Sequence, residues 1–179
     1  MEILAVAAQT IGIAAMVITV LSFQCRSNRN YFLCQEFSGA FFTVSFLIMG
    51  AWSGALMNLF GIVRPELLRR EKFAKSGYTL LFLIAFLIAC TLTVALISDE
   101  KWYLILMTST AQLAGTLGMW TRNGKTIRLC QLFVVSPLWL IYDAAIPIPS
   151  IGGILTEIIN IISVFLALYR YRKIGFTER

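Results

Sequence analysis

The chain has 179 residues, of which 59% are hydrophobic and 13% are charged, and its mean hydropathy is +0.81. A soluble domain usually carries about a quarter charged residues, so this composition excludes a water-soluble globular fold. The absence of histidine excludes catalysis by a Ser-His-Asp or Cys-His arrangement within the chain.

Seven apolar runs are separated by charged or turn-forming residues, and each is long enough for a helix to cross about 30 Å of hydrocarbon. They show no period-2 alternation, so helices are expected rather than barrel strands. The expected spans are Ile3–Phe23, Tyr31–Gly50, Trp52–Leu68, Gly77–Ile97, Trp102–Trp120, Leu129–Ile146 and Ile151–Tyr169. The predicted fold class is therefore an all-α polytopic membrane protein with seven transmembrane helices.

The lysine and arginine residues predict an orientation. All of them except Lys101 follow the first, third, fifth or seventh span or lie near the end of the third. Because basic loops remain in the cytoplasm, this asymmetry places the N-terminus outside and the C-terminus in the cytoplasm. The net charge of +6 therefore reflects topology, and a nucleic-acid partner is not expected.

The sequence also contains an internal repeat. Residues 26–35 align with residues 122–131, where Arg, Leu, Cys and Gln coincide. A further three-residue shift, expected at the Pro-rich corner 147–150, aligns residues 53–62 with 152–161. Spans one to three then correspond to spans five to seven in the same orientation, as parallel repeats in a 3+1+3 arrangement. Chance similarity between apolar segments is the competing explanation.

The repeat divides the chain into a first three-helix unit at residues 1–70, a linker helix at 71–101, and a second three-helix unit with a basic tail at 102–179. This 3+1+3 arrangement resembles the SWEET and PQ-loop transporter superfamily. Members of that group typically have Pro-Gln at the end of the first helix of each repeat. This chain has Phe23-Gln24 and Met119-Trp120 there, so the proline expected to act as a hinge is absent from both repeats.

Three local motifs narrow the resemblance. They are Ala8-Gln-Thr-Ile-Gly12, then Leu21-Ser-Phe-Gln24 followed by Arg26, and the stretch from Asn58 to Arg64. These motifs look most like those of YgjV-type bacterial inner-membrane proteins. The resemblance implies a multi-pass protein of the bacterial inner (plasma) membrane.

Two acidic residues fall within the last two expected spans. Glu157 lies six residues into the seventh span, and Asp143 lies near the outer end of the sixth. A charge in the membrane costs about 2.5 to 3.5 kcal/mol on insertion scales, so it usually faces a partner or a cavity. The hairpin between these spans brings Asp143 and Glu157 to similar depth, where they are candidates for a proton or cation site. Alternatively, Asp143 faces water in the interface.

An ion pair is expected between Glu36 on the second span and Arg64 on the third, which lie at similar depth near the cytoplasmic end. The repeat counterparts, Leu132 and Ser163, are both uncharged. An acid and a base that disappear together indicate a pair, because either one alone would be left uncompensated. Alternatively, each side chain extends separately to the membrane surface.

The expected substrate-binding residues are Asn58, Trp139, Tyr142, Glu157 and Asn160. Asn58 and Asn160 lie on the third helices of the two units, on roughly the same face. In SWEET-like proteins an asparagine pair from these helices forms a substrate clamp, which the resemblance implies here; hydrogen bonding between helices is the competing role. Trp139 and Tyr142, one turn apart, offer an aromatic surface and a hydroxyl to a sugar-like ring.

The leading functional hypothesis is a transporter or facilitator of a small polar, sugar-like solute, working by alternating access between the two three-helix units. The alternative is a non-transporting membrane scaffold or interaction protein with the same fold. No motif for a nucleophile, metal or nucleotide accompanies the acidic pair, so no enzymatic activity, metal or cofactor is expected. The expected partners are the lipid bilayer and a small polar solute, and the expected state is a monomer or homodimer.

Overall fold

The computed structural model describes residues 2–48, 52–74, 76–99, 101–145 and 151–172, which are helical and contain no β-strand. The long helices are α1 (Glu2–Gln24), α2 (Asn28–Ile48), α3 (Trp52–Arg69), α5 (Gly77–Ile97), α6 (Trp102–Trp120) and α9 (Ile151–Tyr171), and the short α4 (Glu71–Ala74) follows α3. A further long segment comprises α7 (Gly124–Cys130), the π-helical η1 (Gln131–Val135) and α8 (Ser136–Ala145). The expected all-α fold is confirmed for the described residues.

Five of these segments are long and apolar enough to cross a membrane: Val6–Gln24, Asn28–Ile48, Gly77–Ile97, Gly124–Ala145 and Gly153–Tyr171. The helices α3 and α6 have similar lengths but are more polar, since α3 contains Arg64 and Glu66 and α6 contains Gln112. Both helices pack against each other and against α5. Protein neighbours therefore surround much of their polar surface, which lowers the cost of placing these groups in a bilayer.

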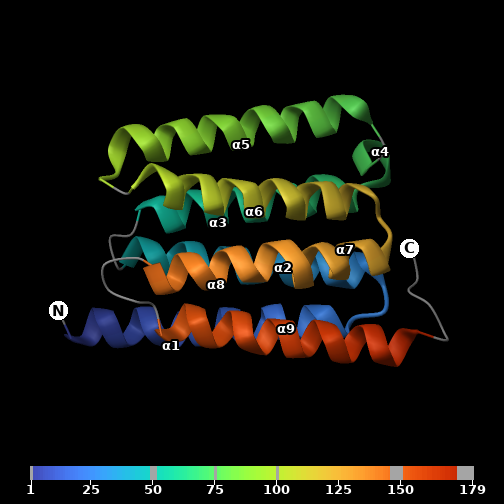
Figure 1. Cartoon of the computed structure of the whole chain (residues 1–179), viewed down its shortest axis with the longest axis horizontal. Helices are drawn as coiled ribbons and strands as arrows, with labels where there is room; N and C mark the ends of the chain where they lie inside the picture. The colour runs from blue at the N-terminus through green and yellow to red at the C-terminus, as the bar shows by residue number, and fades with distance from the viewer. Residues whose placement is uncertain (1, 49–51, 75, 100, 146–150, 173–179) are drawn as a thin grey trace.

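The helices run side by side in two layers (Figure 1). One layer consists of α1, α2 and α3, packed in that order, and the other consists of α6, the α7–η1–α8 segment and α9. The layers meet where α1 packs on α9 and where α3 packs on α6, and α5 lies against α3 and α6 at one edge. The helix α1 begins at one end of the bundle and α9 finishes at the opposite end (Figure 1).

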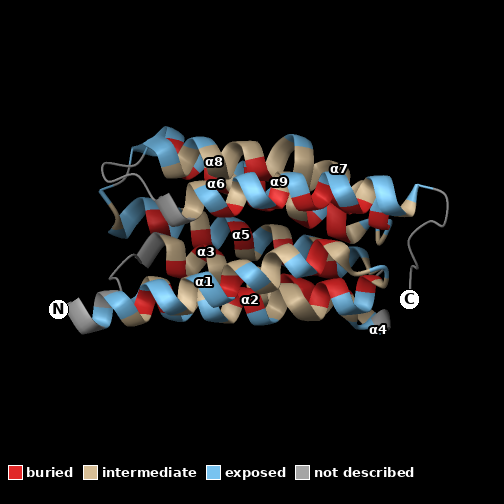
Figure 2. Cartoon of the chain, turned by 90° about the horizontal axis from the view of Figure 1, so that it is seen from below, coloured by how far each residue is buried: buried red, intermediate tan, exposed pale blue. Residues whose placement is uncertain are grey.

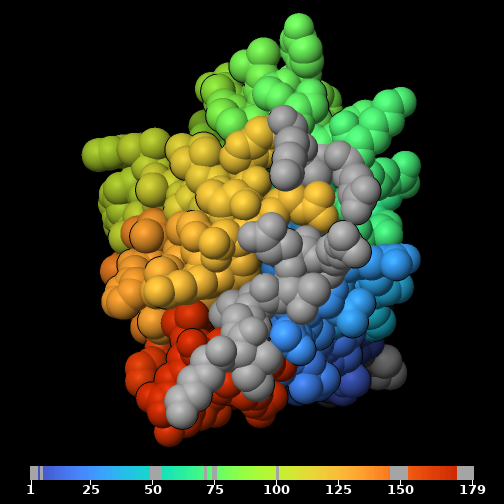
Figure 3. Space-filling view, turned by 90° about the vertical axis from the view of Figure 1, so that its right-hand side faces the viewer, coloured from blue at the N-terminus to red at the C-terminus, as the bar shows by residue number. Residues whose placement is uncertain are grey.

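The basic turns gather at one end of the bundle. Figure 3 shows this end, where the blue α1–α2 turn, the yellow-orange α6–α7 turn and the red end of α9 lie near one another. Arg26 and Arg122 lie in these turns, and Arg29 and Lys125 lie at the starts of α2 and α7. Lys101 precedes α6 at the opposite end. The distribution of charge along the bundle therefore follows the predicted asymmetry.

Small residues and hydroxyls join α1 to α2. The Ser45 hydroxyl donates to the Ala8 carbonyl at 2.8 Å, and the Ser38 hydroxyl donates to the Ala15 carbonyl at 3.0 Å. Both alanines are fully buried. Because these pairs recur seven residues apart on each helix, the two antiparallel helices stay close over much of their length. The polar residues of this contact join the two helices.

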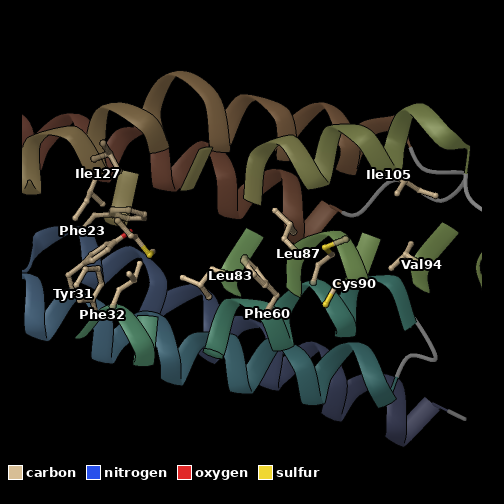
Figure 4. Packing of buried hydrophobic residues seen from close by; sticks show 14 residues of the cluster. Phe23, Tyr31, Phe32, Phe60, Leu83, Leu87, Cys90, Val94, Ile105 and Ile127 are labelled. Atoms are coloured by element: carbon tan, nitrogen blue, oxygen red, sulfur yellow. The ribbon is translucent and has the colours of Figure 1, made fainter. Parts of the chain in front are cut away.

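Buried apolar side chains fill the bundle and pack the helices together. Towards one end, Phe23, Tyr31 and Ile127 come together from α1, α2 and α7, while Phe60 and Leu83 lie further along the bundle (Figure 4). Buried residues in Figure 2 lie mainly between the layers, and exposed residues cover the outside. Many exposed side chains are themselves large and apolar, among them Leu96 and Tyr78, each 86% exposed. Such an exterior suits lipid and not water.

Candidate functional site

The hairpin of α8 and α9 brings the two predicted acids together. Asp143 lies one turn or less from the end of α8, and its carboxylate fits against Gly153 near the start of α9. A β-carbon at Gly153 would overlap that carboxylate, so the glycine provides the space that it occupies. Asp143 also lies close enough to Glu157 for the two carboxyl groups to interact electrostatically. The predicted proximity of the two acids is present in the structure.

Glu157 belongs to a buried polar cluster that also contains Ser136 and Asn160. Its carboxylate accepts hydrogen bonds from the Ser136 side chain and from the Asn160 amide, the latter at 3.4 Å. Asn160 is only 1% exposed, and its amide oxygen is buried without a hydrogen-bond partner. The Gln131 amide donates to the Ser136 hydroxyl at 2.9 Å. Four side chains from η1, α8 and α9 thus form one network within the membrane-spanning hairpin.

A wide helical turn positions Ser136. The Ser136 amide donates to the Gln131 carbonyl, five residues earlier, which defines the π-helical turn η1. The next residue, Pro137, has no amide hydrogen to continue the regular ladder. Single π-turns of this kind are frequent at functional sites because they shift the direction of the following side chains. Here Ser136 is fully buried and faces Glu157. Neither the π-turn nor the role of Ser136 was predicted from the sequence.

The remaining predicted substrate-binding residues separate into two groups. Trp139 and Tyr142 lie on α8 with their rings 5.5 Å apart at 85°, and Trp139 packs against the apolar core. Asn58 lies on α3, where its amide donates to the Gly54 carbonyl of the same helix at 2.8 Å. Its hydrogen bond is thus internal to α3, and Asn160 bonds to Glu157. The two asparagines are not bonded to each other among the described contacts, and the clamp stays a prediction.

The predicted ion pair between Glu36 and Arg64 is wrong. The Arg69 Nε donates to Glu36 Oε1 at 3.1 Å, and Arg69 also pairs with Glu66. Positions 64 and 69 are five residues apart, which corresponds to about 140° around a helix. Arg69 therefore faces α2, where Glu36 lies, while Arg64 faces α6.

Arg64 joins the two layers. Its Nη1 donates to the side-chain oxygen of Gln112 at 2.9 Å and to the Gln112 carbonyl at 3.2 Å. The Gln112 amide donates in turn to the Met57 carbonyl on α3 at 3.3 Å. Gly115 leaves room for this contact, because a β-carbon there would lie 2.9 Å from Nη1. The arginine is 8% exposed, and its guanidinium lies 5.6 Å from the Phe60 ring.

A double-mutant cycle can test the corrected pairing. We expect Glu36→Gln and Arg69→Gln to show a coupling of about 0.5 to 1 kcal/mol, because the two side chains are partly exposed (16% and 24%). The same cycle with Glu36→Gln and Arg64→Gln should give a coupling near zero. The measurement is the free energy of unfolding of the purified protein in detergent. A larger coupling for the second pair than for the first would contradict the geometry.

Comparison with known protein families decides where the protein resides. Residues 6–174 match Imp-YgjV, described as a bacterial inner membrane protein. The chain belongs to this family. Together with the five segments that can span a membrane, this confirms the predicted multi-pass localisation in the bacterial inner membrane. No curated protein and no solved structure matches the chain.

In this Imp-YgjV protein, hydrogen bonds also join the two layers at the basic end. Arg128 of α7 is completely buried, and its guanidinium donates to the Phe23 carbonyl at 3.0 and 3.2 Å and to the Cys25 carbonyl at 2.6 Å. The Tyr171 hydroxyl of α9 donates to the Gln24 carbonyl at 2.9 Å. Because the last carbonyls of a helix lack partners within it, donors from the second layer cap the end of α1.

Two further contacts strengthen this junction. The Gln24 amide donates to the Ser163 carbonyl at 2.8 Å and to the Ser163 hydroxyl at 2.7 Å, which links α1 to α9. The Asn28 amide donates to the carbonyl of Arg122 in the α6–α7 turn. Arg128 was counted in the sequence only as a mark of topology, and nothing in the sequence pattern indicated that its side chain would be buried.

Proposed function

We propose that this Imp-YgjV protein is a transporter or facilitator that moves a small polar, sugar-like solute across the bacterial inner membrane. The observation that carries the proposal is the cluster of Ser136, Glu157 and Asn160, with Asp143 beside it, in a membrane-spanning hairpin. Ionisable groups within membrane-spanning segments are costly, and they usually mark the path of a solute or ion. Pro137 and the adjoining π-turn also interrupt the helix that bears the cluster, as in many transporter sites.

We further propose that α1–α3 and α6–α9 are parallel repeats with the N-terminus outside. Burial supports this proposal, because every buried residue between positions 8 and 32 has a buried counterpart 96 positions later. The pairs are Ala8 and Leu104, Ala15 and Ala111, Ser22 and Gly118, Phe23 and Met119, Asn28 and Gly124, Tyr31 and Ile127, and Phe32 and Arg128. The contact of α1 with α9 and the contact of α3 with α6 are then equivalent by the same repeat.

Alternating access would use the contacts between these layers. The hydrogen bonds described for Gln24, Asn28 and Arg128 join the layers at the basic end, which the proposed orientation places in the cytoplasm. The acidic cluster lies nearer the opposite end, about 9 Å from the start of α9 at Glu157. The π-turn and Pro137 provide a bending point between the two regions, which offsets the missing hinge prolines at Phe23 and Met119.

Transport assays with reconstituted protein test the proposal. Liposomes containing the purified protein should take up at least one solute from a panel of sugars, polyols, amino acids and amines faster than protein-free liposomes. Counterflow with unlabelled solute inside should increase the uptake of labelled solute, because a carrier exchanges its substrate. A panel in which no solute moves faster than in protein-free liposomes would contradict the proposal.

The buried ties between the layers favour a second function, that of a membrane scaffold with no transport activity. Arg128 is 0% exposed and binds carbonyls of the other layer, as expected of a permanent contact. A single cysteine at position 160, in a variant lacking Cys25, Cys34, Cys90 and Cys130, distinguishes the two functions. A transporter should expose this cysteine to a water-soluble maleimide from one side of the membrane, and a scaffold should protect it from both sides.

A further inference from the structure

We infer that the Ser136–Glu157–Asn160 cluster binds a monovalent cation, either Na⁺ or the ammonium group of a solute. The inference rests on the proposed function, because it names the chemistry of the species held at the same site. It goes further in assigning a positive charge to the species held there. That species is either an ion bound in addition to the solute or the solute's own ammonium group.

The side chains of the cluster contain more hydrogen-bond acceptors than donors. Glu157 and Asp143 contribute carboxylate oxygens, and Asn160 contributes an amide oxygen. The side-chain donors are the Ser136 hydroxyl and the amide groups of Asn160 and Gln131, and the Gln131 amide donates to Ser136. Ser136 and Asn160 both direct their donors at Glu157. The Asn160 amide oxygen is then left buried and without a partner, beside the same carboxylate. A buried acceptor of this kind is costly unless something binds it.

Among the residues that the structure describes, no lysine or arginine of the neighbouring helices is paired with these carboxyl groups. Arg128 of α7 donates to the Phe23 carbonyl at the basic end. The sequences of α1, α6 and α8 contain no lysine or arginine, and in α9 the basic residue is Arg170, in the last turn. The buried Arg64 on α3 is held by Gln112. Two carboxylates that lie close together in a membrane are stabilised when a proton or another cation neutralises their charge. The unpartnered Asn160 oxygen provides a further ligand for a bound cation, which a proton on a carboxylate would not use.

The ligand set favours a monovalent ion. Glu157 supplies one carboxylate, and the Asn160 oxygen and the Ser136 hydroxyl are neutral, whereas Asp143 is held against Gly153 at the edge of the cluster. One close carboxylate balances a single positive charge. Carboxylate, carbonyl and hydroxyl oxygens are also hard ligands, which suit Na⁺ or an ammonium group and not a soft transition metal.

Thermal unfolding of the purified full-length protein in detergent tests the inference. Tryptophan fluorescence is followed in NaCl, methylammonium chloride or MgCl₂, each compared with choline chloride at the same ionic strength. We expect Na⁺ or methylammonium to raise the midpoint of unfolding by about 3 to 6 °C at ten times its dissociation constant. A response to Na⁺ identifies an ion site, and a response to methylammonium alone identifies a site for the ammonium group of a solute.

Matched variants locate the site. Glu157→Gln keeps the shape of the side chain and should remove the shift, and Asn160→Ala should require about tenfold more cation for the same shift. Asp99→Asn removes an exposed carboxylate at the same end of the bundle and should leave the shift unchanged. If Glu157→Gln does not fold, Asn160→Ala provides the comparison. A full shift in Glu157→Gln, an unchanged cation requirement in Asn160→Ala, a response to Mg²⁺ alone, or no shift in the wild type overturns the inference.

The two proposals can fail separately. A wild-type protein that is stabilised by Na⁺ or methylammonium but moves none of the solutes contradicts transport and leaves the cation site in place. A protein that moves a neutral sugar and shows no cation-dependent shift contradicts the cation site and leaves transport in place.

Discussion

Glu157→Gln is expected to reduce solute accumulation by reconstituted liposomes by about tenfold to a hundredfold, because a hydrogen bond to a charged group contributes about 1.5 to 3 kcal/mol. The substituted amide can still bond to Ser136 and Asn160, so the hairpin should keep its packing. The loss should appear as reduced accumulation against a gradient, while exchange of solute across the membrane continues. Accumulation and counterflow are measured on the same liposomes with the transported solute.

The comparison variant for this experiment is Asp99→Asn, since Asp99 is an exposed carboxylate outside the membrane-spanning segments. It should accumulate solute at the wild-type rate. Equal accumulation by Glu157→Gln and the wild type would show that the Glu157 carboxylate has no role in coupling. Loss of both accumulation and exchange would indicate that Glu157 is required for solute movement itself, which facilitated diffusion also allows.

Arg128→Met is expected to destabilise the protein by about 3 kcal/mol, which corresponds to a fall of roughly 6 to 12 °C in the midpoint of thermal unfolding. The substitution removes the hydrogen bonds to the Phe23 and Cys25 carbonyls and leaves the end of α1 without its cap. It also removes the guanidinium that lies 5.5 Å from the Tyr31 ring. Part of this loss is offset because a buried cation is no longer desolvated.

Two further variants separate the causes. Arg128→Lys keeps the charge but loses the planar group that reaches both carbonyls, so it should fall between Arg128→Met and the wild type. Arg26→Met removes an exposed arginine from the same region and should change the midpoint by less than about 1 °C. If Arg128→Met unfolds at the same midpoint as the wild type, the contacts of Arg128 at the basic end contribute little to the stability of the protein.

The positions of the long helices could be predicted because lipid imposes strong constraints on sequence. The expected span Gly77–Ile97 coincides with α5, and the expected span Trp102–Trp120 coincides with α6. The first expected span, Ile3–Phe23, differs from α1 by one residue at each end. Charged residues and prolines end an apolar run sharply, so these runs and their helices share boundaries. The agreement is poorer where a helix extends through polar residues: the expected sixth span begins at Leu129, whereas its helical segment begins at Gly124.

The partners of buried polar residues could not be predicted in the same way. Arg64 and Arg69 both lie at a depth in the membrane similar to that of Glu36. The depth of a residue does not indicate which face of α3 carries it. The choice between Arg64 and Arg69 depends on the rotation of α3 against both α2 and α6, which no single helix specifies. The acidic hairpin was predictable because Asp143 and Glu157 lie on consecutive spans, which usually pack side by side. The predicted Pro-rich corner at 147–150 lies outside the described residues.

The peripheral position of α5 has a consequence for how the polypeptide can vary. Its exposed face is broad and apolar, with Leu81, Ile88, Leu92 and Leu96 all exposed, and it rests on α3 and α6 alone among the helix pairs with substantial contact. The interaction partners given above for Asp143, Glu157 and Arg128 lie on other segments and not on α5. The length and apolar composition of α5 can therefore vary while the contacts of Asp143, Glu157 and Arg128 in the other helices are kept.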